Sequence, residues 1–141
     1  MNVNELRKLN THFFDEVFRR RNVDAIDELL SDDFVEHTPA PGQDTGKQGA
    51  KEFIGQALAA FPDMDVEIEH EIAEGDTVAT VVRFTGTHQG EFAGVPATGR
   101  KVSVYFIDVT RYRDGLCTEH WGLPDIGNLM VQLGAAPGGP R

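Results

Sequence analysis

The chain has 141 residues, 40% of them hydrophobic and 26% charged, which is typical of a single globular domain. Its formal net charge of −10 argues against nucleic acid and membrane surfaces as partners, because both are bound through Lys and Arg. The single cysteine, Cys117, excludes an internal disulfide, and no Cys/His cluster has zinc-ligand spacing, so we expect no metal. No signal peptide or bilayer-length apolar run is visible, which indicates a cytoplasmic protein.

The first half of the chain has the hydrophobic periodicity of helices. The spacing predicts an amphipathic helix over the first twenty residues, a short one within 22–34, and a third over 50–61 that stops before Pro62. The stretch "FVEHTP", 34–39, is long enough for one short strand only.

The period then changes from about 3.6 to 2, the period of strands. In 64–72 the apolar Met64, Val66, Ile68 and Ile72 alternate with acidic residues, which predicts a strand with one buried face. Strands follow at 77–86, 101–112 and 116–123, with a long loop at 87–99. Asp125 is expected to cap a last short helix that ends at Gly134.

These elements predict an α+β fold, with one domain at 1–134 and a loose tail at 135–141. We expect a conical barrel in which a strongly twisted antiparallel sheet wraps around the N-terminal helices. Such a cone leaves a pocket for a hydrophobic small molecule between sheet and helices.

Two polar residues stand on an otherwise apolar strand face. Parity places Asp108 on the face of Val102, Val104 and Phe106. A bulged three-residue turn at "RDG" would oppose Asp108 to His120, whereas a two-residue Asp-Gly turn would oppose it to Trp121. We favour the bulged turn because it keeps both polar residues on one face. A carboxylate beside a histidine suits acid–base catalysis, although a buried structural ion pair is an equal alternative.

Four further residues are candidates for this pocket. His37 ends the short strand near the expected mouth, where a surface histidine is equally plausible. His88 lies in the long loop, which would act as a lid. Phe34 and Phe106 are expected to line the wall. The opposite strand face carries Tyr105, Ile107, Val109 and Trp121, and an apolar patch of this size suggests a homodimer.

Five motifs in order carry a resemblance to a known family: "DDFVEHTP", "AAFPDMDVEIEHEIAEGDTVA", "GTHQGEFAGVPATGRKV", "RYRDGLCTEHWGLPD" and "QLG". Together they resemble the SnoaL-like polyketide cyclases, also called ester cyclases, over nearly the whole chain. The resemblance implies the nuclear-transport-factor-like α+β cone. It also implies an intramolecular aldol condensation without metal or cofactor, and an oligomer.

Only some of the site residues of the cyclases have a counterpart in this sequence. The cyclases have His-Trp-Asp on the last strand, with that Asp as acid/base; here His120 and Trp121 match, but Gly122 stands in place of the Asp. Asp108 falls near a pocket histidine of the cyclases, and His37 falls near the base of the related ketosteroid isomerases. We therefore expect a cyclase-type enzyme with His120 as base, Asp108 as its partner and His37 or His88 as donor. The alternative is a small-molecule-binding protein of the same cone.

Overall fold

The structure is a computed structural model and describes residues 1–135, so all of the expected tail except Ala135 lies outside the described residues. The elements are α1 (Val3–Phe13), the π-helical turn η1 (Phe14–Arg19), the 3-10 turn η2 (Val23–Ala25), α2 (Ile26–Leu29), β1 (Leu30–Glu36), α3 (Lys47–Ala60), β2 (Asp65–Glu74), β3 (Thr77–Thr87), β4 (Lys101–Arg113), β5 (Leu116–Pro124) and α4 (Ile126–Gln132).

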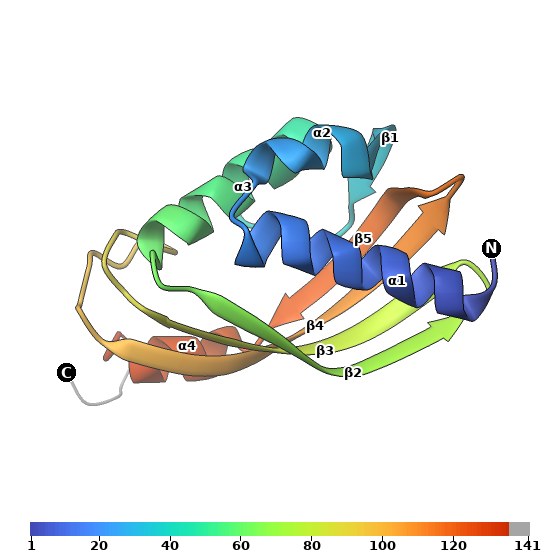
Figure 1. Cartoon of the computed structure of the whole chain (residues 1–141). Coiled ribbons are helices and arrows are strands. Elements are labelled where there is room, and N and C mark those ends of the chain that lie inside the picture. The colour runs from blue at the N-terminus through green and yellow to red at the C-terminus, as the bar shows by residue number, and fades with distance from the viewer. Residues whose placement is uncertain (136–141) are drawn as a thin grey trace.

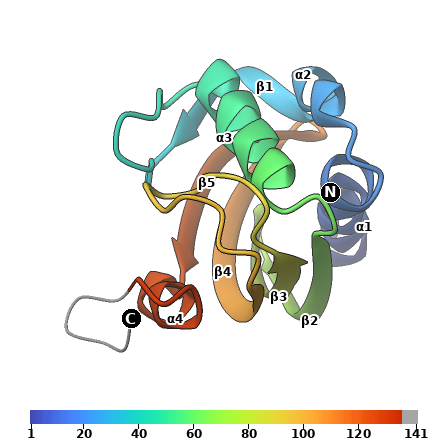
Figure 2. The ribbon, with the colours of Figure 1, turned by 90° about the vertical axis from the view of Figure 1, so that its left-hand side faces the viewer.

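The fold is built on one curved sheet of five strands, which lie in the order β1-β5-β4-β3-β2. Helices α1 and α3 lie over its concave side, which we call the inner face (Figures 1 and 2). The strands β2 to β5 form the expected antiparallel meander, but β1 pairs with β5 in parallel. This parallel pair adds a fifth strand to the expected meander, because α3 and three strands separate β1 from β5 and allow the chain to return in the same direction. The strands β1 and β2 remain edges, so the sheet is open and not a closed barrel.

The inner face carries two apolar clusters with a polar row between them. One cluster includes Phe61, Val82 and Val104, and the other includes Leu6, Val78 and Tyr112. On β3 and β4 the boundary between them is the cross-strand pair Thr80 and Asp108. Since both apolar clusters exclude water, polar groups in this row require partners within the protein.

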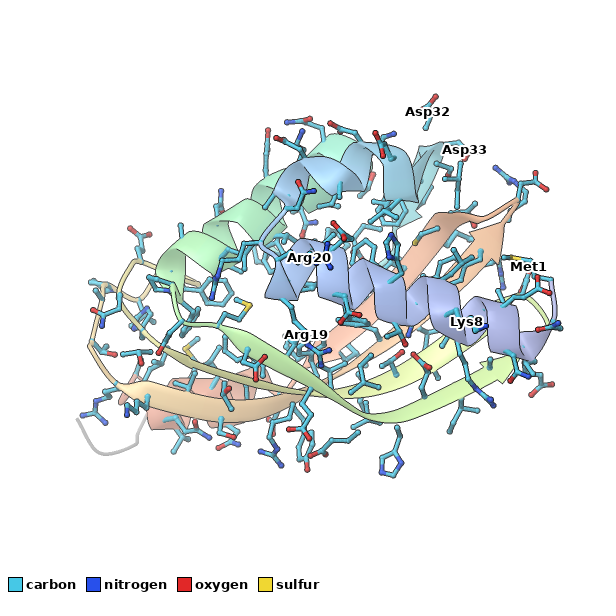
Figure 3. The ribbon with its side chains drawn as sticks, in the orientation of Figure 1. Met1, Lys8, Arg19, Arg20, Asp32 and Asp33 are labelled. Carbon is cyan, nitrogen blue, oxygen red and sulfur yellow. The ribbon has the colours of Figure 1, made fainter. Side chains whose placement is uncertain are left out.

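The first helix is fixed to this polar row through Asn10, whose side chain is buried. The Asn10 amide donates to Thr80 Oγ1 and to Glu71 Oε2, both at 2.8 Å, and Asn10 Oδ1 accepts from the Tyr112 hydroxyl at 3.0 Å. At the other end of the helical segment, Arg19, labelled in Figure 3, donates to a backbone carbonyl of β2. These bonds hold the segment across β2 and β3.

A bulge at Glu69 changes the alternation of β2. Ile68 pairs with Val82 on the inner face, but the extra residue moves His70 to the outer face, opposite Val81. Ile72, expected inside, is therefore 65% exposed. The strict alternation inferred from the sequence fails because a bulge shifts every later side chain to the other face.

The last helix begins as expected at Asp125, whose side chain accepts a hydrogen bond from the backbone N–H of Asn128. The side-chain amide of Gln132 donates to and accepts from the backbone of Ser103, so that α4 covers the part of β4 beyond its pairing with β5. Within residues 1–135, no helix is both long and apolar enough to span a membrane.

Candidate active site

Three charged side chains meet on the inner face of the sheet. His120 Nδ1 lies 2.6 Å from Glu36 Oε1, and His120 Nε2 lies 2.7 Å from Asp108 Oδ1. The side chains of Glu36, Asp108 and His120 are 9%, 13% and 28% exposed. We call these three residues the charged triplet. They come from β1, β4 and β5, so only the folded sheet brings them together.

A bulge in β5 turns His120 towards the inner face. The hairpin has a two-residue turn, Asp114-Gly115, both at positive φ, and Arg113 pairs with Leu116. The favoured three-residue turn is therefore wrong, because Asp and Gly tolerate the left-handed backbone that a tight hairpin needs. Thr118 is the extra residue between the pairs Tyr112–Cys117 and Arg111–Glu119.

This bulge decides the partner of Asp108. Without Thr118 as an extra residue, Asp108 would oppose Trp121; with it, Asp108 opposes Gly122. His120 pairs with Thr110 and reaches Asp108 as a diagonal neighbour on the same face. The expected contact between Asp108 and His120 is thus present, although the expected register is not.

The geometry makes His120 an imidazolium. Ionised carboxylates only accept hydrogen bonds, so a ring held at both nitrogens by two carboxylates carries both protons. Burial by itself lowers the pKa of His120, but the charges and hydrogen bonds of Asp108 and Glu36 outweigh it and raise the pKa to about 10. Burial raises the pKa of Glu36, yet its bond to His120 and those to Thr38 bring the pKa below its ordinary value. Neither ring nitrogen of His120 is free to take a proton from a substrate.

The two carboxylates of the charged triplet differ in their free oxygens. Glu36 uses both: Oε1 faces His120, and Oε2 accepts from the backbone N–H and the hydroxyl of Thr38 at 3.1 and 3.0 Å. Asp108 uses Oδ1 for His120, while Oδ2 accepts no hydrogen bond from the described residues. Asp108 Oδ2 is therefore the oxygen of the triplet that remains available to a ligand.

His37 lies on the other side of the sheet from the charged triplet. Its ring stacks on Trp121 with centroids 4.4 Å apart, and its Nε2 lies 3.0 Å from Glu119 Oε1. Burial alternates from Phe34 to His37, so that Glu36 faces inward and His37 outward. The His37 backbone N–H donates to the His120 carbonyl at 2.9 Å, but the two rings lie on opposite faces of the sheet.

His88 is far from the charged triplet. It follows Thr87, which pairs with Lys101, and Lys101 is seven positions from Asp108 along β4, roughly 20 Å at about 3.3 Å per residue. The ring is completely buried against Phe61, and Nδ1 accepts from the Thr98 backbone N–H at 3.2 Å. His88 is therefore a buried anchor of the loop and not an exposed lid residue.

The two expected wall residues lie on either side of the charged triplet. Phe106, half-buried, packs against the first apolar cluster, and Phe34, 5% exposed, belongs to the second. Two surface depressions of about 380 and 520 Å³ occur elsewhere, at the η2–α2 region and at the β4–β5 hairpin, and none of Phe34, Phe106, Asp108 and His120 lines them. Neither depression is the expected cone pocket.

Glu36 is the site residue that sequence reasoning missed. The signal is present in "FVEHTP": Phe34 is expected to line the wall, and a period of 2 puts Glu36, not His37, on the same face.

Gly122 lies directly beneath the contact between His120 and Asp108. A Cβ at this position would lie 2.6 Å from His120 Cε1 and 2.9 Å from Asp108 Oδ1. Contacts this short require the neighbours to move. The absence of a side chain at Gly122 is therefore a condition for the contact of His120 with Asp108.

Comparison with known proteins accounts for this arrangement of sheet and helices. A model of the SnoaL-like polyketide cyclase family matches residues 8–133. The chain belongs to this family. Among its relatives, the nogalonic acid methyl ester cyclase of Streptomyces nogalater is 29% identical over 119 residues, covering 83% of this chain and 89% of the relative. The aklanonic acid methyl ester cyclase of Streptomyces peucetius is 31% identical over 107 residues, covering 76% and 72%.

A solved structure supports the same fold assignment. TsrD from Streptomyces laurentii superposes with a TM-score of 0.86 at 27% sequence identity, over 96% of this chain and 98% of that chain. The expected SnoaL-like cone is thus confirmed as the fold. Within this family, the chain has Gly122 where the resemblance places an Asp, and its carboxylates come from β1 and β4 instead.

The pKa of His120 predicts how stability depends on pH. The folded pKa, about 10, is above the ordinary 6.5, so the folded state binds the proton more tightly and is stabilised most below about pH 6.5. This contribution, at most about 5 kcal/mol, is lost as pH rises through 10. Urea unfolding at pH 7, 9 and 10.5 should show the loss in the wild type. His120→Asn should be less stable at pH 7 and lose less on the way to pH 10.5; parallel curves would contradict the prediction.

The space at Gly122 predicts that Gly122→Ala separates His120 from Asp108. Overpacking of this kind costs about 1–3 kcal/mol, and the pKa of His120, followed by NMR of the ring nitrogens, should fall because one carboxylate is lost. Gly122→Asp should do the same. Gly127→Ala, where nothing lies within 4 Å of the added Cβ, is the matched control. An unchanged His120 pKa in Gly122→Ala would refute the conclusion that the bare backbone of Gly122 is a condition for the contact of His120 with Asp108.

Proposed function

We propose that this chain is an enzyme that closes a ring in a hydrophobic carbonyl compound by an intramolecular aldol reaction. Asp108 is the base, His120 is the fixed cation beside it, and Glu36 holds His120. The observation that carries the proposal is that Asp108 Oδ2 accepts no hydrogen bond from residues 1–135, next to an imidazolium whose two nitrogens both face carboxylates. His37 and His88 have no part in it, because they lie on the other face and at the far end of β4.

The reaction needs one proton to leave carbon and one to return to oxygen. Asp108 Oδ2 takes a proton from a carbon next to a carbonyl, and the resulting enolate carbon attacks a second carbonyl of the same molecule, forming the C–C bond. The new alkoxide then takes the proton back from Asp108, so that the product is an isomer of the substrate. His120 stays positive throughout and offsets the negative charge, whether on Asp108 or on the enolate.

The charges around Asp108 support a neutral substrate. Glu36 and Asp108 carry two negative charges against the single positive charge of His120. A substrate carboxylate next to this group would be repelled, whereas an ester would not. The two cyclase relatives are named for methyl esters, and we propose that this chain also acts on a hydrophobic polyketide methyl ester.

The outer face of β4 and β5 supports a homodimer as part of the same proposal. Tyr105, Ile107 and Leu123 are 39%, 50% and 70% exposed there. Aromatic residues and arginine, which are enriched in interface cores, also lie on this face, with Arg83 4.1 Å above the Tyr105 ring. A second copy would cover these apolar side chains.

Replacing the base predicts a loss of turnover. Asp108→Asn should lower kcat by about 10²–10⁴, because the amide keeps the shape but cannot accept a proton from carbon. Turnover is followed by chromatography of nogalonic and aklanonic acid methyl esters after incubation with the protein. Asp65→Asn, at an exposed position of β2, is the control and should retain activity. Equal turnover by Asp108→Asn and wild type would remove Asp108 as the base; binding of both esters without turnover would favour a binding protein.

The proposed dimer should dissociate, and its mass in solution should halve, when a charged residue is placed on its apolar face. Ile107→Lys should convert the dimer to a monomer in light scattering at micromolar concentration, because a lysine at the centre of the contact is costly to bury. Val3→Lys, on the exposed side of α1, should leave the mass unchanged. A monomeric wild type would contradict the proposal.

A further inference from the structure

Thr38, which follows β1, is hydrogen-bonded to Glu36 of β1 and to Gly122 of β5. Its hydroxyl accepts from the Gly122 backbone N–H at 2.8 Å and lies 3.0 Å from Glu36 Oε2. Its own backbone N–H donates to the same Glu36 oxygen at 3.1 Å. Thr38 thus connects the β5 residue under the triplet with the carboxylate that holds His120.

The direction of these hydrogen bonds is fixed by chemistry. A hydroxyl has one proton, and Glu36 as a carboxylate only accepts. Because Thr38 Oγ1 already accepts from Gly122, its proton goes to Glu36. The result is one chain of donors and acceptors, from the Gly122 N–H through Thr38 to Glu36, and from Glu36 through His120 to Asp108.

This chain makes the two carboxylates unequal. Three donors surround Glu36, one from His120 and two from Thr38, and each favours its ionised form. Glu36 therefore neither takes the proton from His120 nor offers an oxygen to a ligand. Among the residues that the structure describes, Asp108 has one donor, and its Oδ2 accepts no hydrogen bond.

We propose that Thr38 is the positioning residue that locks Glu36 and so selects Asp108 as the base of the site. The choice of base rests on the proposed function; the locking of Glu36 rests only on the contacts above. Thr38 acts through Glu36 and His120 and touches no substrate. Its role would be invisible from the sequence, where Thr38 appears as a polar residue before Pro39.

The test replaces only the hydroxyl. Thr38→Val keeps the shape and the backbone N–H but loses the bonds to Gly122 and Glu36; Thr38→Ser keeps them. The pKa of Glu36, measured by carboxyl ¹³C NMR, should rise by about one unit in Thr38→Val and stay unchanged in Thr38→Ser. With a substrate, kcat of Thr38→Val should fall by roughly tenfold or more at nearly constant KM, because Glu36 and His120 lose their fixed position.

Thr87→Val is the matched control. Thr87 makes the same two hydrogen bonds to another carboxylate, from its backbone N–H to Asp63 Oδ1 and from its hydroxyl to Asp63 Oδ2, both at 2.7 Å, at the end of β3 away from Glu36. It should leave the pKa of Glu36 unchanged. If Thr38→Val does not fold, Thr38→Ala is measured in the same way. An unchanged Glu36 pKa in the folded variant overturns the lock. If the pKa of Glu36 rises in Thr38→Val but the wild-type protein cyclises no ester, the role of Thr38 in holding Glu36 is retained. Only the proposed function is then refuted.

Discussion

The contact of His120 with two carboxylates is the interaction on which the site depends. Charges on the inner face of a sheet are costly unless each is paired, and here one cation pairs with Glu36 and Asp108 at 2.6 and 2.7 Å. The pairing fixes the imidazole as a cation and removes both its nitrogens from acid–base chemistry. It also leaves a net negative charge between the two apolar clusters of the inner face.

The surrounding structure meets the geometric demands of this contact. The bulge at Thr118 turns His120 inward, the bare backbone of Gly122 leaves room beneath the ring, and Thr38 holds Glu36. The polar row continues away from the triplet through Thr80 to Asn10 of α1, whose amide is bonded to β2 and β3. Hydrogen-bonded polar groups thus cross the inner face where the two apolar clusters meet, and they dock the first helix on the sheet.

Within the SnoaL-like polyketide cyclases, the chain has the fold of the family and pairs His120 with carboxylates from β1 and β4. The resemblance places an acid/base Asp at the position of Gly122, and here any side chain at that position would collide with His120 and Asp108. The β4 carboxylate and the glycine are therefore coupled: a chain that pairs His120 with Asp108 in this way has no room for an aspartate on β5. A new carboxylate at position 122 would disturb this site.

The sequence by itself determined the order of elements, the α+β class, the face of Asp108 and the cap at Asp125, because each follows from local periodicity or from one residue's backbone chemistry. It also contained the inward parity of Glu36, which stands two positions after Phe34. Only the tertiary structure decided the rest: the parallel pairing of β1 with β5, the outward position of His37, the burial of His88 and the partner of Asp108. Two bulges, at Glu69 and Thr118, each shift the facing of side chains by one residue. A bulge is decided by how two strands fit together across space, and a single strand's pattern does not encode it.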